Sequence, residues 1–66
     1  MNLIRIDKVQ ELTTLGKSTI WELASEKDGT FPKARKLSKR VTVWIEEEII
    51  EWINFQFSQK YENKKG

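Results

Sequence analysis

Residues 6–29 read IDKVQELTTLGKSTIWELASEKDG and contain the clearest local pattern in the chain. Two short helical patterns lie on either side of Gly16, and a turn at Asp28-Gly29 ends the second one. Two short helices joined by a turn of three or four residues that contains glycine are typical of a helix-turn-helix motif. Because other helical hairpins share this spacing, the rest of the chain has to decide between them.

Capping residues and periodicity set the boundaries of both helices. Asp7, with Gln10 three residues later, matches an N-cap with a capping box and predicts a helix over residues 8–13. The second helix is predicted from Lys17 or Ser18 to about residue 27. The residues expected to form its buried stripe are Ile20, Leu23 and Ala24.

A basic hairpin is predicted after the second helix. Phe31-Pro32 favours an extended chain, and residues 34–37 and 41–44 are two β-favouring runs around Ser38-Lys39-Arg40. We expect Trp44 to point into the core at the end of the second run, because an exposed indole there would be costly.

The last helix is predicted over Glu46–Ser58, with a frayed tail over residues 61–66. Three glutamates fill its first turn and lysines follow its end, which is the polarity that the helix dipole favours. The residues expected on its core-facing side are Ile45, Ile49, Trp52 and Ile53. Trp44 and Trp52 are therefore expected to pack in the core and not to stack on bases.

The order of helix, turn, helix, hairpin and helix predicts a mostly α winged helix-turn-helix fold. It has three helices and a small, basic two-stranded wing, in a single domain over residues 1–60. The second helix of such a fold enters a major groove, while the hairpin lies along the backbone or minor groove.

Charge is distributed unevenly along the chain. Residues 1–44 carry nine Lys or Arg against five Asp or Glu, whereas residues 45–66 carry three against five. Five of the eight residues from 33 to 40 are basic and none is acidic. A solvated loop is one interpretation, but such a cluster at the position of a wing favours binding to nucleic acid.

The composition excludes several kinds of site. The chain has no cysteine and no histidine, so disulfides, thiolate metal sites and imidazole chemistry are excluded. We therefore expect no enzyme, no cofactor and no metal site. No apolar run approaches the ~18 residues of a membrane span, and the charged N-terminus does not match a secretory signal. We expect a cytoplasmic, nucleoid-associated protein.

Several motifs resemble the AlpA-type prophage regulators, small relatives of the excisionase and MerR-like winged-helix proteins. The resemblance covers about residues 3–54 and implies a DNA-binding protein of a prophage or other integrated element. Members act as transcriptional regulators, as excision factors that set the direction of recombination, or as both. The matching motifs are Arg5-Ile6-x-x-Val9, Leu15-Gly16-Lys17-Ser18-Thr19-Ile20-Trp21-x-Leu23, Phe31-Pro32-Lys33 and Val43-Trp44-Ile45-Glu46-x-Glu48-Ile49-x-x-Trp52-Ile53.

Three positions depart from the family pattern. Ala34 replaces a second proline, and Ser38-Lys39 replaces glycine near the hairpin tip, which increases the charge there. Lys17 stands where the family has a serine cap before the recognition helix, so Ser18 is expected to cap that helix instead.

The first turns of the second helix supply the candidate base contacts. Lys17 and Ser18 are the first candidates, with Lys17 donating to guanine or to a phosphate. Thr19 either packs or contacts a phosphate. Trp21 either contacts DNA through its indole N–H and ring face or packs against the base of the wing. Glu22 either accepts from cytosine or orients a nearby cation.

The basic hairpin supplies the candidate backbone contacts. Strand alternation directs about half of its cations towards DNA, and we expect Arg35, Lys39 and Arg40 to be among them. Lys36 is a further phosphate or minor-groove candidate, and Lys33 is a candidate through its place in Phe-Pro-Lys. This hypothesis requires the hairpin and the start of the second helix to open on a common side.

The expected partner is double-stranded DNA. A domain of this size buries only about 600–1,000 Å² on DNA, so we expect a free monomer that binds repeated sites cooperatively, with an integrase or RNA polymerase as protein partner. The alternative is a protein-interaction module, antitoxin- or adaptor-like, that uses the edge formed by Ile50, Phe55 and Phe57 of the last helix.

Overall fold

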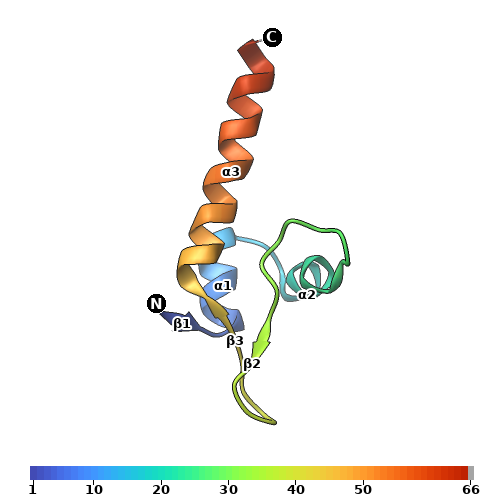
Figure 1. Ribbon diagram of the computed structural model, residues 1–66, viewed down its shortest axis with the longest axis vertical. Helices are drawn as coiled ribbons and strands as arrows, with labels where there is room; N and C mark the ends of the chain where they lie inside the picture. Colours follow the sequence, from blue (N-terminus) through green and yellow to red (C-terminus); the bar gives the residue numbers. More distant parts are fainter. Residues whose placement is uncertain (66) are drawn as a thin grey trace.

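The computed structural model describes the backbone of residues 1–65 and the side chains of residues 1–58. Three helices pack around a small sheet, which confirms the mostly α winged helix-turn-helix fold (Figure 1). The elements are β1 (Leu3–Ile4), α1 (Ile6–Thr13), α2 (Lys17–Ser25), β2 (Arg35–Lys36), β3 (Thr42–Ile45) and α3 (Glu46–Lys65).

The sheet has three antiparallel strands in the order β1-β3-β2. The predicted hairpin corresponds to β2 and β3, with Arg35 opposite Val43. The third strand was not predicted: Leu3 and Ile4 pair with the other edge of β3, opposite Ile45 and Trp44. A strand of two residues is too short to show an alternating pattern, so only the tertiary pairing defines it.

The start of α1 differs from the prediction. The N-cap is Arg5, whose extended backbone carbonyl accepts from the N–H groups of Lys8 and Val9, each at 3.1 Å. The prediction that Asp7 caps this helix is therefore wrong. Because β1 holds the chain extended through Arg5, the helix begins at Ile6, and Asp7 lies in its first turn, where its charge still favours the helix dipole.

The start of α2 also differs from the prediction. Gly16 is the N-cap, with an extended backbone and no side-chain cap, and its carbonyl accepts from the Ile20 N–H at 3.0 Å. The prediction that Ser18 caps the helix is wrong, because Ser18 already lies inside the first turn. The helix ends at Ser25 and not near residue 27, because the chain turns at the C-cap Glu26.

The core forms where the three helices meet β3. Trp44 is fully buried, as predicted, together with Val9, Ile20 and Ile49. Ile20 and Ala24 are the buried positions of α2, which confirms its predicted stripe. Leu23, Trp52 and Ile53 pack against this cluster as partly buried residues.

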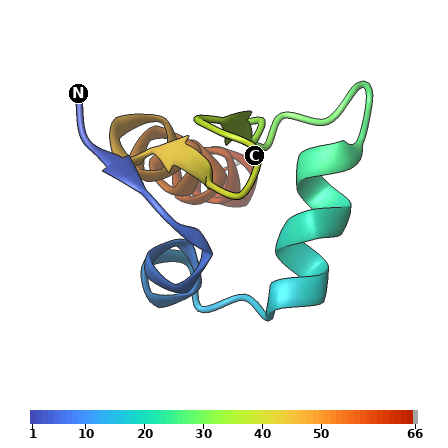
Figure 2. The same cartoon turned by 90° about the horizontal axis from the view of Figure 1, so that it is seen from below.

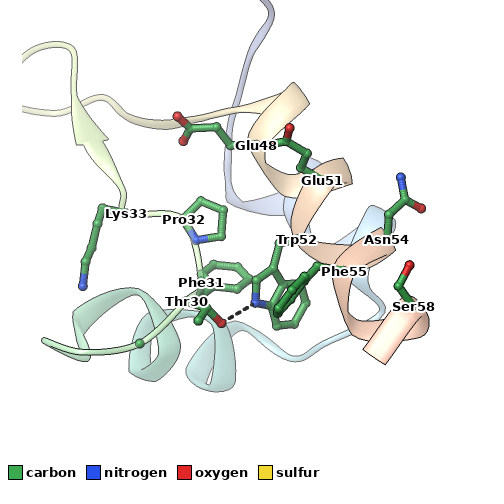
Figure 3. Close-up of a pocket in the computed structure, with 11 residues that line it drawn as sticks. Thr30, Phe31, Pro32, Lys33, Glu48, Glu51, Trp52, Asn54, Phe55 and Ser58 are labelled. Carbon is green, nitrogen blue, oxygen red and sulfur yellow. Dashed lines mark hydrogen bonds between the residues drawn. The ribbon is translucent and has the colours of Figure 1, made fainter. Parts of the chain in front are cut away.

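The loop between α2 and β2 is fastened to α3 by aromatic residues. Phe31 is 3% exposed and meets the Trp52 ring edge-on, with the ring centroids 4.9 Å apart. Trp52 Nε1 donates to Thr30 Oγ1 at 3.3 Å (Figure 3). The indole of Trp52 is thus used in packing, as expected for the core-facing side of the last helix.

The last helix is longer than predicted. α3 continues past Ser58 to Lys65 and projects away from the rest of the domain (Figure 1). No glycine or proline occurs between Ser58 and Gly66, and most of the intervening residues favour helix, so nothing in the sequence ends it earlier. The predicted tail thus begins inside α3, and Gly66 lies outside the described residues. The fraying of this tail and the domain boundary at residue 60 stay predictions.

The turn between α1 and α2 begins with a left-handed residue. Thr14 has φ 62° and ψ 14°, and its N–H donates to the Gln10 carbonyl at 2.7 Å, which closes the end of α1. Thr13 Oγ1 accepts from the Leu15 N–H at 3.2 Å and so holds the next residue of the turn. A left-handed conformation costs an L-residue about 1–2 kcal/mol, and Thr14 carries that cost.

Replacing Thr14 with glycine should therefore stabilise the domain by about 1 kcal/mol, because glycine adopts positive φ freely. Thermal unfolding should show a rise in Tm of about 4–8 °C. The control is Thr19→Gly in α2, where the backbone is helical and glycine should cost roughly 0.3 kcal/mol. A lower Tm for Thr14→Gly would show that the threonine side chain stabilises the turn by more than its backbone costs.

The N-terminus is fastened to the first turn of α3. The Asn2 N–H donates to Glu47 Oε1 at 3.1 Å, and Asn2 Nδ2 donates to Glu46 Oε1 at 3.0 Å. The N-terminal ammonium of Met1 lies 3.6 Å from Glu47 Oε2. The backbone N–H of Asn2, followed by that of Glu47 itself, lowers the pKa of the Glu47 carboxyl below its ordinary value of 4.5.

This lowered pKa predicts a pH-dependent loss of stability. Since the folded protein holds Glu47 ionised more strongly than the unfolded chain does, the stabilisation is complete above pH 4.5 and is lost as the pH falls through the lowered pKa. Thermal unfolding on either side of that pH should show a steeper fall of Tm for the wild type than for Glu47→Gln, which cannot titrate. Parallel pH profiles would contradict the role of this contact.

Candidate nucleic-acid interface

The second helix presents one face to the core and the other to solvent. Ile20 and Ala24 anchor it in the core. The sequence-predicted residues on α2 all lie on the outside and are all exposed: Lys17, Ser18, Thr19, Trp21 and Glu22. Local periodicity thus separated the buried stripe correctly from the residues that a ligand can reach.

The hairpin of β2 and β3, called the wing from here on, lies beside α2. Seen from below, the wing and α2 are both in view and neither covers the other (Figure 2). The turn at the tip is closed by backbone bonds between residues 37–41, including Leu37 N–H to the Val41 carbonyl at 2.9 Å. That the wing and the start of α2 open on a common side stays a prediction.

Trp21 of α2 packs against the base of the wing. Its ring lies 5.3 Å from that of Trp44, centroid to centroid, at an angle of 53°. Trp44 belongs to β3, so of the two predicted roles of Trp21 the structure shows the packing against the base of the wing. The same ring is 43% exposed, so it also forms part of the surface between α2 and the wing.

Two of the five candidate cations of the loop and wing bind the protein itself. Lys33 Nζ donates to the carbonyl of Glu26, the C-cap of α2, where a cation interacts favourably with the helix dipole. Arg35 Nη2 lies 3.2 Å from Glu48 Oε2 and pairs with α3. Side-chain direction cannot be inferred from a run of basic residues, so the sequence did not reveal either contact.

The remaining three cations gather towards the tip of the wing. Lys36, Lys39 and Arg40 are exposed, and within the described residues none of them pairs with an acidic group. Lys36 Nζ donates to the Lys39 carbonyl at 3.3 Å, which holds its ammonium close to the turn. The tip therefore carries the uncompensated positive charge of the wing.

The absence of a side-chain cap at the start of α2 was not predicted from the sequence. No side chain caps it, and its first turn contains no acidic residue but begins with Lys17. A Cβ on Gly16 would meet nothing within 4 Å, and its φ of −75° suits any residue, so the backbone does not require glycine here. A glycine at the N-cap followed by lysine is the pattern that indicates an uncapped helix start. Glycine has no side chain to accept from the first N–H groups, and lysine places a cation beside them.

A groove of about 700 Å³ lies on another side of the domain, between the loop of residues 29–33 and α3 (Figure 3). Phe31, Trp52 and Phe55 supply its apolar lining, and Glu48 and Glu51 its acidic rim. Lys33 is the one cation among these lining residues, so their charge is net negative, and we place the candidate nucleic-acid interface on α2 and the wing, where the unpaired cations lie.

Comparison with known proteins identifies the group to which this arrangement belongs. The family model described as prophage CP4-57 regulatory protein (AlpA) matches residues 2–57, which include α1, α2, the wing and the packed part of α3. The chain belongs to the AlpA family. The predicted resemblance to prophage regulators of this type is confirmed.

A curated member of the AlpA family supports the same assignment. The chain is 34% identical over 58 residues to the DNA-binding transcriptional activator AlpA of Escherichia coli strain K12, over 82% of this chain and 83% of that protein. The comparison with solved structures found no match. Among the residues described here, no helix has the length and apolar character needed to traverse a lipid bilayer.

Proposed function

We propose that this AlpA-family protein binds double-stranded DNA in a sequence-specific manner, with α2 in the major groove and the wing on the backbone or minor groove. The observation that carries the proposal is the contact between Trp21 and Trp44, which joins α2 to the base of the wing. The relative from E. coli is named as a DNA-binding activator, and its match covers both elements.

The first turn of α2 is suited to an anion. Lys17 stands at the positive end of the helix dipole, where a cation is unfavourable unless a negative group approaches it. The uncapped N–H groups of the same turn lack side-chain acceptors. A DNA phosphate satisfies both requirements, and it places the side chains of Lys17 and Ser18 against base edges.

The wing supplies positive charge for contacts to DNA phosphates, and such contacts do not depend on the base sequence of the DNA. Lys39 and Arg40 occupy its tip, and Lys36 lies close to the same turn. Phosphate contacts of this kind position a protein on the duplex, whereas contacts from α2 read the bases. We assign Lys33 and Arg35 a supporting role, because they hold the loop and wing against α2 and α3.

Within the AlpA family, we propose that this chain serves a prophage as transcriptional regulator, excision factor or both. All of these roles use the same DNA-reading surface. A single domain buries only about 600–1,000 Å² on DNA, so we propose cooperative binding to repeated sites, with an integrase or RNA polymerase as protein partner.

Removing a cation from the tip of the wing should weaken binding to all sequences. For Arg40→Ala, the slope of log affinity against log salt should become shallower by about 0.9 or less, because one phosphate contact is lost. Arg35→Ala is the matched control and should change the slope little, since Arg35 pairs with Glu48. Fluorescence anisotropy over a salt series measures both; an unchanged slope for Arg40→Ala and Lys39→Ala would remove the wing from the interface.

Changing the first turn of α2 should alter sequence preference. In a binding selection from random duplex DNA, Lys17→Ala and Ser18→Ala should each change the consensus, because each base contact discriminates by about 1–3 kcal/mol. Lys39→Ala serves as the control and should lower affinity with the consensus retained. If both α2 variants select the wild-type consensus, this turn does not read bases.

A further inference from the structure

The wing carries a large apolar side chain close to its tip. Leu37 directly follows β2 and is 63% exposed, more than any other large apolar residue of the described chain except Met1. It belongs neither to the buried core nor to the apolar residues packed against that core. A single exposed leucine is ordinary on a protein surface, so its meaning depends on what surrounds it.

Positive charge lies on both sides of Leu37 in the turn. Lys36 precedes it, Lys39 and Arg40 follow it, and all three are exposed. Within the described residues, none of these cations pairs with an acidic group. Lys36 Nζ donates to the Lys39 carbonyl at 3.3 Å and so links the two limbs of the turn. A polyanion attracted by these cations therefore meets the leucine at the same place.

The backbone around Leu37 is already ordered. The Leu37 N–H donates to the Val41 carbonyl at 2.9 Å, and the Val41 N–H donates to the Ser38 carbonyl at 3.3 Å. The base of the same hairpin is fastened to α3, since Arg35 Nη2 lies 3.2 Å from Glu48 Oε2. An apolar side chain on an ordered backbone loses little further freedom on binding, so more of its burial contributes to affinity.

The dimensions of B-DNA limit what such a tip can reach. The minor groove is about 6 Å wide. The backbones of two paired strands are already about 4.8 Å apart, before their side chains are added. The hairpin as a whole is therefore too broad to enter this groove, but one side chain at its tip is not. Cations on the two limbs of the turn can contact the phosphate backbones that border the groove.

The chemistry of the minor groove decides how a leucine is accommodated there. The floor presents hydrogen-bond acceptors of every base pair and the amino group of guanine. A leucine lying across this floor would exclude water from polar atoms that it cannot satisfy, which costs free energy. Between two neighbouring base pairs, the same side chain meets the apolar faces of the rings instead. Insertion of an apolar side chain in this way partly unstacks the base step and kinks the duplex.

We propose that Leu37 inserts between two base pairs from the minor groove and kinks the duplex beside the site that α2 contacts. The inference rests on the proposed function, because it requires the wing to lie on DNA. Pyrimidine–purine steps such as TA and CA unstack most easily, so the wedge favours such a step at its place of insertion. Leu37 thus adds a sequence preference that no hydrogen bond to a base supplies.

Fluorescence of 2-aminopurine tests the insertion. This adenine analogue brightens when it loses stacking, and it is placed at successive positions on both flanks of the site that α2 contacts. Saturation with the wild type should brighten it at one step, and Leu37→Ala should lose that signal. Leu37→Met keeps an apolar side chain of similar volume and should retain it. Lys39→Ala is the matched control, because it removes a charge and keeps the leucine, and should retain the signal at saturation.

Affinity and selection experiments test the energetic role of Leu37. Leu37→Ala should lower affinity for the selected duplex by about tenfold, because burial of three carbon atoms is lost. The slope of log affinity against log salt should not change, since no charge is removed. In a selection from random duplex DNA, Leu37→Ala should lose the preference for a pyrimidine–purine step and retain the rest of the consensus. A shallower salt slope, or an unchanged consensus, would contradict the wedge.

These readouts separate the wedge from the proposed function. If the wild type binds a duplex but brightens 2-aminopurine at no position, or if Leu37→Ala brightens it equally, the wedge is overturned and the proposed function stands. If the wild type binds no duplex, both are overturned. Leu37 is exposed, so Leu37→Ala should retain the wild-type Tm, and the wild-type signal decides the insertion even where a variant does not fold.

Discussion

The contact between Trp21 and Trp44 joins α2 to the central strand β3. Trp44 is fully buried where the helices meet the sheet, and its strand is paired on both edges. Trp21 lies against it from α2. A domain of this length has a small core, so one aromatic pair has a large share in fixing the angle between its elements. The helix and the wing are therefore held in one arrangement before any ligand binds.

The basic residues around the wing have two different physical roles. Lys33 and Arg35 neutralise a helix end and a glutamate of the same chain, and so use their charge to fasten the loop and wing to the body. Lys36, Lys39 and Arg40 keep their charge at the tip, where it is available to a polyanion. Lys33 and Arg35 hold the base of the hairpin through these contacts, and the base in turn carries the charged tip.

α3 has one role at each of its ends. Its first half closes the core through Ile49 and Trp52 and receives the N-terminus through Glu46 and Glu47. Its second half projects from the domain at the end opposite the wing (Figure 1). A projecting helix segment gains no packing energy from its own core, so its helical form rests on local preference.

Four features could be predicted from the residues alone: the order of the helices and the hairpin, the buried stripe of α2, the inward position of Trp44 and the exposure of the candidate residues on α2. These features follow from periodicity and local conformational preference, which act over a few neighbouring residues. The AlpA assignment also followed from motifs in the sequence, and the family match confirmed it. Which cations are bound by the protein itself could not be predicted, because folding brings the Glu26 carbonyl to Lys33 and the Glu48 carboxylate to Arg35. It likewise decided the third strand and the caps at Arg5 and Gly16, because pairing of Leu3 and Ile4 with β3 places the chain before α1 and overrides the local preference of Asp7.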